Sequence, residues 1–406
     1  MSELIKIEEY EEWQGSLTDS DWDFLSAELS RQITLRREIR DGKEVCVLNP
    51  NQYVGLIMLP SGTHLQITPK VPVSNLFYMI SIAFDLAWPF RDEFARVEVF
   101  EDVLAAIAQI FAEFVERRVE AGLYRSYVDE EANLNCIRGR ISFTEDVRHN
   151  LLARHRIYCR YAEFTWDIEE NQIIRQVAHL LSGWGFHTEL RLRLSRLDSA
   201  LAEVQPTALA SSVIGRFRYS RLNDDYRPIH QLCRLFLEGS SLSEQLGVCD
   251  SRTFLLDMNK LFETFVTQII QERPDAHIRT VAQPELPLGE DDKVRMRPDL
   301  IIECEGKPVL VADCKYKQTE SEIYRNHDFY QVLAYCTAAG VRRGLLIYPL
   351  HSGPVQDFVK VRNVDVLIEQ ASINLALPFS EFRDECRRFC DAVLSLAPLL
   401  ELALPS

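Results

Sequence analysis

RMRPDLIIECEGKPVLVADCKY, residues 295–316, is the stretch that decides the fold of the C-terminal part of this 406-residue chain. Two strand-like runs, MRPDLIIE and PVLVADCKY, flank a polar corner at residues 304–307. Apolar, β-branched runs on either side of a short polar turn are typical of a β-hairpin. We therefore expect an antiparallel hairpin that turns near Gly306.

This hairpin brings charged residues together. Counted outward from a turn near Gly306, Asp299 and Asp313 face each other. Directly opposed residues have Cβ atoms roughly 4.5–5.5 Å apart and point to the same face, so the two carboxylates can bind one divalent cation. Lys315 lies two residues beyond Asp313, and the period of two along a strand puts its ammonium group on that face.

The alternative for this stretch is a solvent-exposed hairpin face with incidental charges. Like charges that face each other across a sheet are destabilising unless a cation lies between them. The apolar run at residues 309–312 indicates a strand deep inside a domain. Both observations favour a metal-binding site.

Two flanking helices are expected to serve the same site. Residues 257–270, DMNKLFETFVTQII, have apolar residues at helical spacing, and Glu263 can reach toward the hairpin. A solvated helix carboxylate is the alternative for Glu263. Residues 327–335, HDFYQVLAY, place Gln331 and Tyr335 four apart on one helix face. The alternative there is an ordinary packed helix with a polar flank.

A helix glutamate, a PD pair, a DxK triplet and a QxxxY helix, in this order, resemble the PD…(D/E)xK nuclease superfamily. The four pieces lie within residues 263–335, and together they are much more specific than PD and DxK alone. The resemblance implies a mixed sheet flanked by helices. It also implies a set of catalytic residues, namely Asp299, Asp313, Lys315, Glu263, Gln331 and Tyr335.

More narrowly, the chain resembles the McrC family, the nuclease subunits of McrBC modification-dependent (type IV) restriction systems. The resemblance rests on NLFYMISIAF at 75–84, CIRGRISF at 136–143, LFETF at 261–265, the hairpin, and YQVLAY at 330–335. Residues 1–70 look like an N-terminal addition of longer members. The resemblance implies docking on a hexamer of the AAA+ GTPase McrB, stimulation of GTP hydrolysis, and DNA cleavage after translocation. In that family the ring usually recognises methylated cytosine.

Composition and charge set limits on the function. With 47% hydrophobic and 26% charged residues the chain is globular, and it is too long for a single core. A net charge of −16 argues against binding nucleic acid through bulk charge. No GxxxxGK[ST] loop occurs, so a partner must supply any nucleotide dependence. Ten cysteines without a CxxC pair predict no zinc site.

The start of the chain and its apolar runs predict a cytoplasmic location. MSELIKIEEYEEW is acidic and lacks the apolar segment of a secretory signal. The longest apolar runs are shorter than the roughly 18 residues that cross a bilayer. We therefore expect no membrane contact.

Sequence patterns predict a multidomain α+β or α/β protein of three parts. Residues 1–72 form an acidic, β-rich domain, in which QITLRREI, EVCVLN, YVGLIML and HLQIT predict an antiparallel meander. Residues 73–249 form a helical domain that docks on the AAA+ partner. Residues 250–406 form the nuclease domain, with Asp250 and Ser251 as a boundary and helix cap.

Helical spacing fails within the middle part at about residues 123–166, which we call the finger segment. Residues 135–160 hold six arginines against two acidic residues, and IRGRISF and RIYCRYAEF alternate like strands of an exposed hairpin, with Gly139 at a bend. In McrC-like proteins the matching region is a finger that enters the pore of the GTPase hexamer. This implies that Arg138 and Arg140 stimulate the partner's GTPase. A DNA-backbone patch and an ordinary solvated face are the alternatives.

Together these features predict an Mg²⁺-dependent endonuclease for double-stranded DNA, with Mn²⁺ as a substitute. Asp299, Asp313 and Glu263 would hold the metal, and Lys315 would position or help deprotonate the attacking water. The chain itself is expected to bind no nucleotide. A catalytically silent adaptor of an AAA+ ring and a stand-alone DNA repair nuclease are the alternative functions. The complete set of two aspartates and a lysine favours the enzyme over the adaptor.

Overall fold

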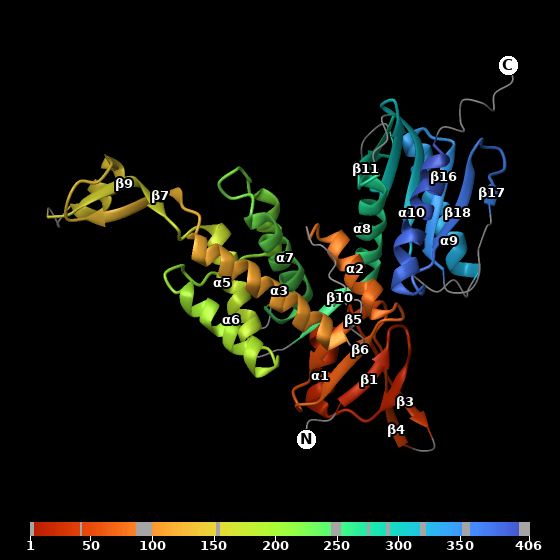
Figure 1. Cartoon of the computed structure of the whole chain (residues 1–406), viewed down its shortest axis with the longest axis horizontal. Coiled ribbons are helices and arrows are strands. Elements are labelled where there is room, and N and C mark those ends of the chain that lie inside the picture. The colour runs from red at the N-terminus through yellow and green to blue at the C-terminus, as the bar shows by residue number, and fades with distance from the viewer. Residues whose placement is uncertain are drawn as a thin grey trace. The chain divides into compact units, whose positions relative to one another are not determined.

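The computed structural model describes residues 4–40, 43–86, 100–151, 155–244, 253–273, 277–289, 293–316, 322–350 and 358–397. Helices and strands are mixed throughout (Figure 1). The chain divides into two compact units, one of Met1–Val103 with Gly239–Ser406 and one of Leu104–Glu238. The expected boundary and cap at Asp250 and Ser251 lies outside the described residues.

The N-terminal part of the first unit holds α1 (Asp19–Glu28) and two small sheets. One sheet has the order β2 (Trp13–Gly15), β4 (Lys43–Asn49), β3 (Thr34–Arg40). The other has the order β1 (Leu4–Glu8), β6 (His64–Thr68), β5 (Tyr53–Met58), β10 (Phe254–Asp257).

All four expected N-terminal strands are therefore present, but the prediction of one antiparallel meander is wrong. β4 and β5 belong to different sheets, and β1 pairs with β6 in parallel. Each sheet has one apolar face, and both bury it in a common core that includes Leu25 of α1, Leu48 and Leu65. The two sheets pack around α1 to share this core. The consecutive strands β4 and β5 therefore lie in different sheets.

β10 connects the N-terminal sheet to the C-terminal part of the unit. It pairs with β5, and Leu255 faces Gly55. A side chain at Gly55 would be excluded, because its Cβ would lie 1.9 Å from the carbonyl oxygen of Phe254. α8 (Met258–Gln271) follows at once, and its N-cap Asp257 accepts a hydrogen bond from the backbone N–H of Asn259 at 2.9 Å. The N-terminal sheet thus determines where α8 begins.

The C-terminal part of the unit is built on a six-stranded mixed sheet. Its order is β11 (Ile278–Ala282), β14 (Leu300–Cys304), β15 (Lys307–Cys314), β16 (Arg343–Pro349), β18 (Leu367–Ile373), β17 (Phe358–Lys360). β15, β16 and β18 are parallel, and the other pairs are antiparallel. β12 (Leu286–Pro287) and β13 (Arg295–Met296) form a separate pair. A mixed sheet in this region agrees with the expectation from the sequence.

Helices pack against this sheet. α9 (Glu322–Ala339) packs on β15 and β16, and α10 (Phe379–Ser395) packs on β18 and beside α8 (Figure 1). α2 (Val73–Ala83) joins them, because the ring of Tyr78 contacts Phe265 of α8 and Phe382 of α10. Asn75 Nδ2 of α2 also donates to the carbonyl oxygens of Leu375 and Leu377 at 2.9 and 2.8 Å.

The ends of β1 and β15 are joined by buried hydrogen bonds. Glu9 is fully buried, and its Oε1 accepts from the backbone N–H of Lys70 at 2.8 Å and from the hydroxyl of Tyr316 at 2.7 Å. The hydroxyl of Tyr10 donates to the carbonyl oxygen of Tyr316 at 2.7 Å. Tyr316 follows Lys315 directly, so the N-terminal sheet holds the backbone next to this lysine.

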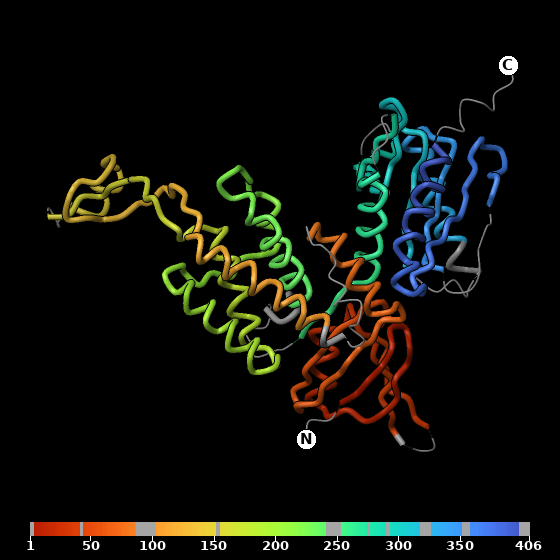
Figure 2. The backbone as a smooth tube through the Cα atoms, in the orientation of Figure 1, coloured from red at the N-terminus to blue at the C-terminus, as the bar shows by residue number. Residues whose placement is uncertain are grey.

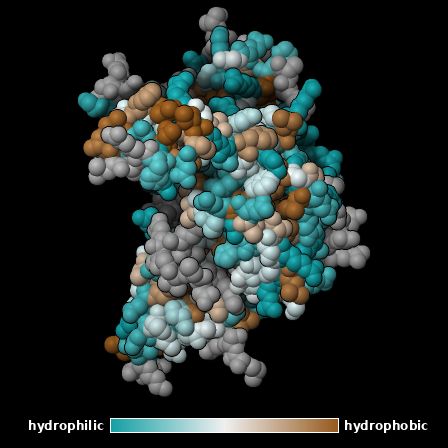
Figure 3. Space-filling view, turned by 90° about the vertical axis from the view of Figure 1, so that its left-hand side faces the viewer, coloured by the Kyte–Doolittle hydropathy of each residue, from teal (hydrophilic) through white to brown (hydrophobic). Residues whose placement is uncertain are grey.

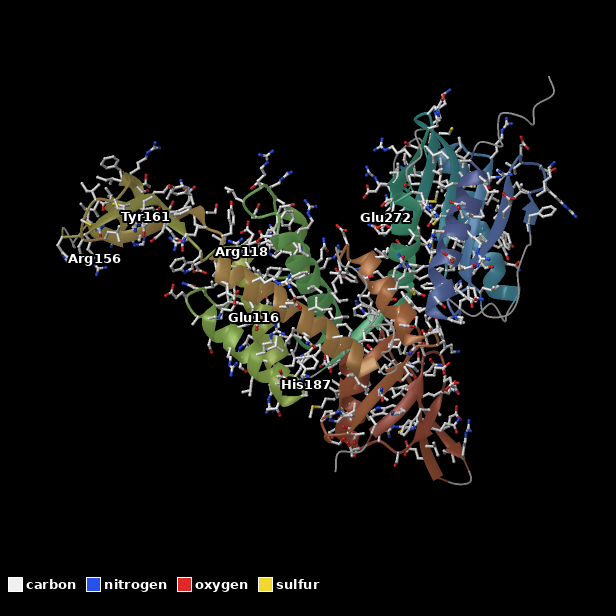
Figure 4. The ribbon with its side chains drawn as sticks, viewed as in Figure 1. Glu116, Arg118, Arg156, Tyr161, His187 and Glu272 are labelled. Carbon is white, nitrogen blue, oxygen red and sulfur yellow. The ribbon has the colours of Figure 1, made fainter. Side chains whose placement is uncertain are left out.

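The second unit contains most of the middle helices. They are α3 (Phe100–Ala121), which begins in the first unit, α5 (Glu169–Ser182), α6 (Thr188–Ala200), the 3-10 turn η2 (Ser211–Arg216) and α7 (Tyr226–Glu244), which ends in the first unit. In its core the buried hydroxyl of Tyr226 donates to Asn171 Oδ1 at 2.7 Å. Arg193 of α6 donates through Nε to Glu116 Oε1 of α3 at 2.6 Å. Figure 4 labels Glu116 on α3.

The finger segment forms a three-stranded sheet with a short helix, α4 (Phe143–Asn150). β7 (Ser126–Leu134) and β9 (Ile157–Thr165) run antiparallel along their full lengths, side by side in Figures 1 and 2. β8 (Arg140–Ile141) pairs with the other edge of β9.

The predicted pairing within the finger segment is therefore partly wrong. RIYCRYAEF is a strand, but its long partner is Ser126–Leu134, and IRGRISF contributes two strand residues only. Gly139 explains the interruption, because it turns the chain at φ 68°, where a Cβ would lie 2.5 Å from the carbonyl oxygen of Arg160.

Within the described ranges, no helix combines the length and the apolar character needed to cross a membrane.

Replacing Glu9 with Gln should change how stability depends on pH. Burial raises the pKa of Glu9 from 4.5 to about 7. Between these values the folded chain keeps a proton that the unfolded chain has lost, so the wild type loses about 3 kcal/mol of stability as pH rises through this window. Glu9→Gln has no such loss, and its melting temperature relative to the wild type should rise from pH 4.5 to 7.5.

Thermal unfolding followed by circular dichroism measures this difference. Glu8→Gln serves as the control, because the Glu8 side chain is 41% exposed. Parallel pH profiles for Glu9→Gln and the wild type would contradict the assignment of a buried, proton-binding carboxyl group.

Candidate active site

The predicted hairpin is present and consists of β14 and β15. Its turn residues Glu305 and Gly306 both have left-handed backbones, with φ 51° and 79°, as a two-residue hairpin turn of the primed type requires. At the other end Leu300 faces Ala312. Asp299 directly precedes Leu300, so the register carries it opposite Asp313, as the sequence predicts.

An irregularity in β15 produces this register. Near the turn Glu303 faces Pro308, but one residue further along Ile302 faces Leu310, so β15 carries one extra residue. Such a bulge shifts every later pair by one position, and a shift of one residue turns a side chain to the opposite face of the sheet. The bulge therefore decides that Asp299 faces an aspartate rather than the alanine before it.

The acidic side chains of this pair are largely removed from water. The Asp313 side chain is 2% exposed, and its Oδ2 lies 2.7 Å from Lys315 Nζ. Asp299 Oδ2 accepts a hydrogen bond from the backbone N–H of Cys314 at 2.7 Å. A solvent-exposed hairpin face with incidental charges is thereby excluded.

Burial and neighbouring charges change the pKa values of all three groups. Burial raises the pKa of Asp299 to about 8, and the carboxylates of Asp313 and Glu263 add to this effect. Burial also raises the pKa of Asp313 despite the nearby ammonium group. Burial alone would lower the pKa of Lys315, but the carboxylates of Asp313 and Asp299 outweigh it and raise that pKa. Lys315 is therefore a cation that contacts Asp313 and is also stabilised by the charge of Asp299.

The glutamine and tyrosine predicted on α9 lie together. Gln331 Nε2 donates to the hydroxyl of Tyr335 at 2.6 Å, and Tyr335 is buried. α9 packs with Val311 and Leu346, and Val311 shares its face of β15 with Asp313. Burial raises the pKa of Tyr335, and the charges of the hairpin also act on it. The pair therefore borders the opposed carboxylates.

Glu263 influences both aspartates from α8 but is engaged elsewhere. Its carboxylate raises the pKa of Asp299 and of Asp313, and its Oε1 accepts a hydrogen bond from Gln283 Nε2. Within the described residues, no group of three or more His, Cys, Asp and Glu side chains is arranged to hold a metal ion. The opposed aspartates still suit a hard divalent cation, because they are oxygen donors on one face whose repulsion a cation would relieve.

Sequence reasoning missed several neighbours of the site. Asp328 on α9 is buried, accepts a hydrogen bond from the Tyr348 hydroxyl at 2.8 Å and raises the pKa of Asp313. Asp328 lies one helical turn before Gln331, and this spacing could have indicated that its side chain is on the same helix face. Gln283 donates its backbone N–H to the carbonyl oxygen of Asp299 at 2.9 Å. Nothing in the local sequence marks this glutamine, because only the pairing of β11 with β14 brings it to the site.

Arg138 and Arg140 lie in the second unit and differ in their surroundings. The Arg138 guanidinium lies over the ring of Tyr161, 4.0 Å from its centroid, and its Nη1 is 3.4 Å from Glu163 Oε2. Figure 4 labels Tyr161 in the finger segment. Arg140 is exposed and faces Arg160 across the strand pair. No ion pair of Arg140 is found among the described residues, so its charge is the less neutralised of the two.

The finger segment also exposes large hydrophobic side chains. They are Tyr127, Ile137, Phe143, Val147, Leu151 and Phe164. Figure 3 views the molecule from the left-hand side of Figure 1, and hydrophobic residues lie at the surface among hydrophilic ones in this view.

The fold and the site define a mixed α/β protein with two opposed carboxylates, one buried and one partly buried, and a lysine at the end of a central strand. A family model for the McrBC 5-methylcytosine restriction system component matches residues 48–349. The chain therefore belongs to the McrBC 5-methylcytosine restriction system component family.

One solved structure agrees with this at the level of the fold. One chain of a half-complex from a tetradecameric assembly of Thermococcus gammatolerans McrB AAA+ hexamers with bound McrC is similar over 96% of this chain and 100% of that chain, at 17% identity and a TM-score of 0.58. A chain of the Thermococcus gammatolerans McrBC complex matches 66% of this chain and 87% of that chain, at 18% identity and a TM-score of 0.42. No curated protein matches the chain significantly.

Removing one charge from the opposed pair should stabilise the metal-free protein. Asp299→Asn keeps an oxygen that can accept from the Cys314 N–H but removes a buried charge that faces Asp313. In EDTA at pH 8 its melting temperature should exceed that of the wild type by about 2–4 °C for each 1 kcal/mol relieved. Asp384→Asn, on the exposed face of α10, is the control. A lower melting temperature for Asp299→Asn would show that repulsion does not dominate this pair.

Proposed function

We propose that this chain is the nuclease subunit of an McrBC-type restriction system, which cuts double-stranded DNA in the cytoplasm by Mg²⁺-dependent hydrolysis. One observation carries the proposal, namely that the partly buried Asp299 and the buried Asp313 face each other, with Lys315 beside Asp313. The family, described as a component of a 5-methylcytosine restriction system, supports methylated DNA as the target.

Phosphodiester hydrolysis requires a positioned water molecule, neutralisation of charge in the transition state and a stabilised leaving oxygen. Asp299 and Asp313, with Glu263 nearby, would hold Mg²⁺ or Mn²⁺, which would polarise the phosphate and acidify a bound water. Lys315 stays protonated between its two carboxylates, so it would chiefly offer positive charge to the developing anion.

The pair on α9 would act on the orientation of the reactants. Gln331 already donates one amide N–H to Tyr335, which fixes the direction of its carbonyl oxygen. That oxygen can accept a hydrogen bond from a water molecule, and the amide has a further N–H to donate. Tyr335 is thus proposed to hold Gln331, and Gln331 to orient water or a phosphate oxygen.

A hexameric AAA+ GTPase of the McrB type is the proposed partner. The fold similarity to a chain from an assembly of McrB AAA+ hexamers with bound McrC supports this proposal. The finger segment, with its exposed hydrophobic residues and basic window, is the proposed contact. The chain itself has no phosphate-binding loop, so GTP would bind to the partner alone.

Single substitutions in the catalytic set should separate cleavage from partner binding. Asp299→Ala, Asp313→Ala and Lys315→Ala should each reduce Mg²⁺-dependent cleavage at least about 100-fold, because each removes a group expected to act on transition-state charge. Stimulation of the partner's GTPase should stay at the wild-type level, since no finger residue is changed. Cleavage of methylated plasmid DNA and phosphate release measure the two activities. Undiminished cutting by any of the three variants would refute the proposed site.

The two finger arginines should differ in effect. Arg140→Ala should reduce DNA-free stimulation of the partner's GTPase by about fivefold or more, because an exposed charge without an ion pair is removed. Arg138→Ala, the matched control, should reduce it less, because Arg138 already interacts with Tyr161 and Glu163. Normal stimulation by Arg140→Ala, with loss of salt-sensitive DNA binding instead, would indicate a DNA-backbone patch.

A further inference from the structure

Gln283 connects three parts of the candidate site. Its backbone N–H donates to the carbonyl oxygen of Asp299 at 2.9 Å, and its side-chain Nε2 donates to Glu263 Oε1. Its Oε1 accepts from Arg297 Nη2 at 2.6 Å, and its carbonyl oxygen accepts from Arg297 Nε at 3.2 Å. The residue has φ 45°, in the left-handed region that non-glycine residues seldom adopt. The chain is therefore turned back at this point, beside the Asp299 backbone.

Among the residues that the structure describes, the hydrogen-bond partners of Arg297 are neutral groups. Its guanidinium donates to two oxygens of Gln283, one from the side-chain amide and one from the backbone. Arg297 is exposed, and no ion pair of it is found in the part of the chain that the structure describes. Arg295, two residues earlier, contrasts with it, because its Nη1 lies 3.0 Å from Glu285 Oε2. The charge of Arg295 is thus partly neutralised by a carboxylate, whereas the charge of Arg297 remains available to an external anion.

The Arg297 guanidinium has N–H groups that Gln283 does not use and a fixed orientation, and both favour binding of an anion. Gln283 uses the Nε–H and one N–H of Nη2, which leaves three of the five guanidinium N–H groups to donate. A planar guanidinium with its orientation already fixed loses less conformational entropy when it binds a phosphate. Arg297 stands two residues before Asp299 in the sequence, and the backbone of its partner Gln283 is hydrogen-bonded to Asp299, in a chain whose net charge of −16 otherwise repels DNA.

We propose that Arg297, oriented by Gln283, binds a phosphate of the DNA backbone beside the bond to be cut. The inference rests on the proposed nuclease function. Gln283 acts as a positioning residue for two groups, because the same amide that directs Arg297 also holds the Glu263 carboxylate. Engagement of the phosphate by Arg297 and orientation of Glu263 are thus coupled through one side chain.

The test measures DNA binding without cleavage. The full-length chain in EDTA is titrated against a fluorescent DNA duplex over a series of salt concentrations. Arg297→Gln should weaken binding several-fold and lower the slope of log affinity against log salt by about 0.9, the value for one lost phosphate contact. Arg295→Gln, the matched control, should leave the slope close to that of the wild type, because its charge is already paired.

Two further variants separate the contact from a purely structural role. Arg297→Lys should recover part of the salt slope, because a charge remains although the fork geometry is lost. Gln283→Glu should behave like Arg297→Gln, because a carboxylate at this position would neutralise Arg297. Equal slopes for Arg297→Gln and Arg295→Gln, or no rescue by lysine, would overturn the inference.

Cleavage assays distinguish a failure of this inference from a failure of the proposed nuclease function. The wild type is also assayed for cutting with Mg²⁺, its partner and GTP. If it binds the duplex but does not cut it, the nuclease proposal fails. The slopes of log affinity against log salt still decide whether Arg297 binds a phosphate. If the wild type cuts, Arg297→Gln should raise KM more than it lowers kcat. A wild type that binds no duplex at any salt concentration would overturn the phosphate contact itself.

Discussion

Two carboxylates that face each other away from water repel, and only a backbone held from several sides can keep them there. Asp299 and Asp313 are in this position because a left-handed two-residue turn starts the hairpin and a bulge in β15 corrects its register. A parallel strand, β16, and the helix α9 then enclose β15, so the pair cannot separate by moving into solvent. The folding energy of the surrounding sheet thus supports an arrangement that is unfavourable by itself, which is common at functional sites.

The N-terminal sheets are a structural part of this support. The sequence resemblance presents residues 1–70 as an addition found in longer relatives, but β10, which pairs with β5, leads directly into the helix that carries Glu263. At the other end of the site, Glu9 and Tyr10 hold Tyr316, the residue after the lysine. Both ends of the site therefore depend on contacts with a sheet that is distant in sequence.

The net charge of the chain and the charges of single residues have opposite effects on DNA binding. A net charge of −16 disfavours unspecific DNA binding, yet single arginines without carboxylate partners remain at defined places. Arg297 is held by an amide and a carbonyl oxygen, and Arg140 faces another arginine on the finger sheet. A guanidinium that is oriented but not neutralised is suited to an external anion. An acidic protein can in this way limit contact with DNA to the places where its proposed functions need it.

The sequence predicted that Asp299 and Asp313 face each other, but the register of this pair depends on the bulge in β15, which only the structure shows. The sequence by itself determined the hairpin, the lysine two residues beyond Asp313 and the Gln331–Tyr335 pair. These features follow from turn chemistry and from periods of two and 3.6 residues, which act over short distances along the chain. Only the tertiary structure decided the rest: that the N-terminal strands divide into two sheets, that the long partner of β9 is β7, and that Gln283 lies beside Asp299. Strand pairing between distant segments depends on which apolar faces can be buried together, and no local pattern records that choice.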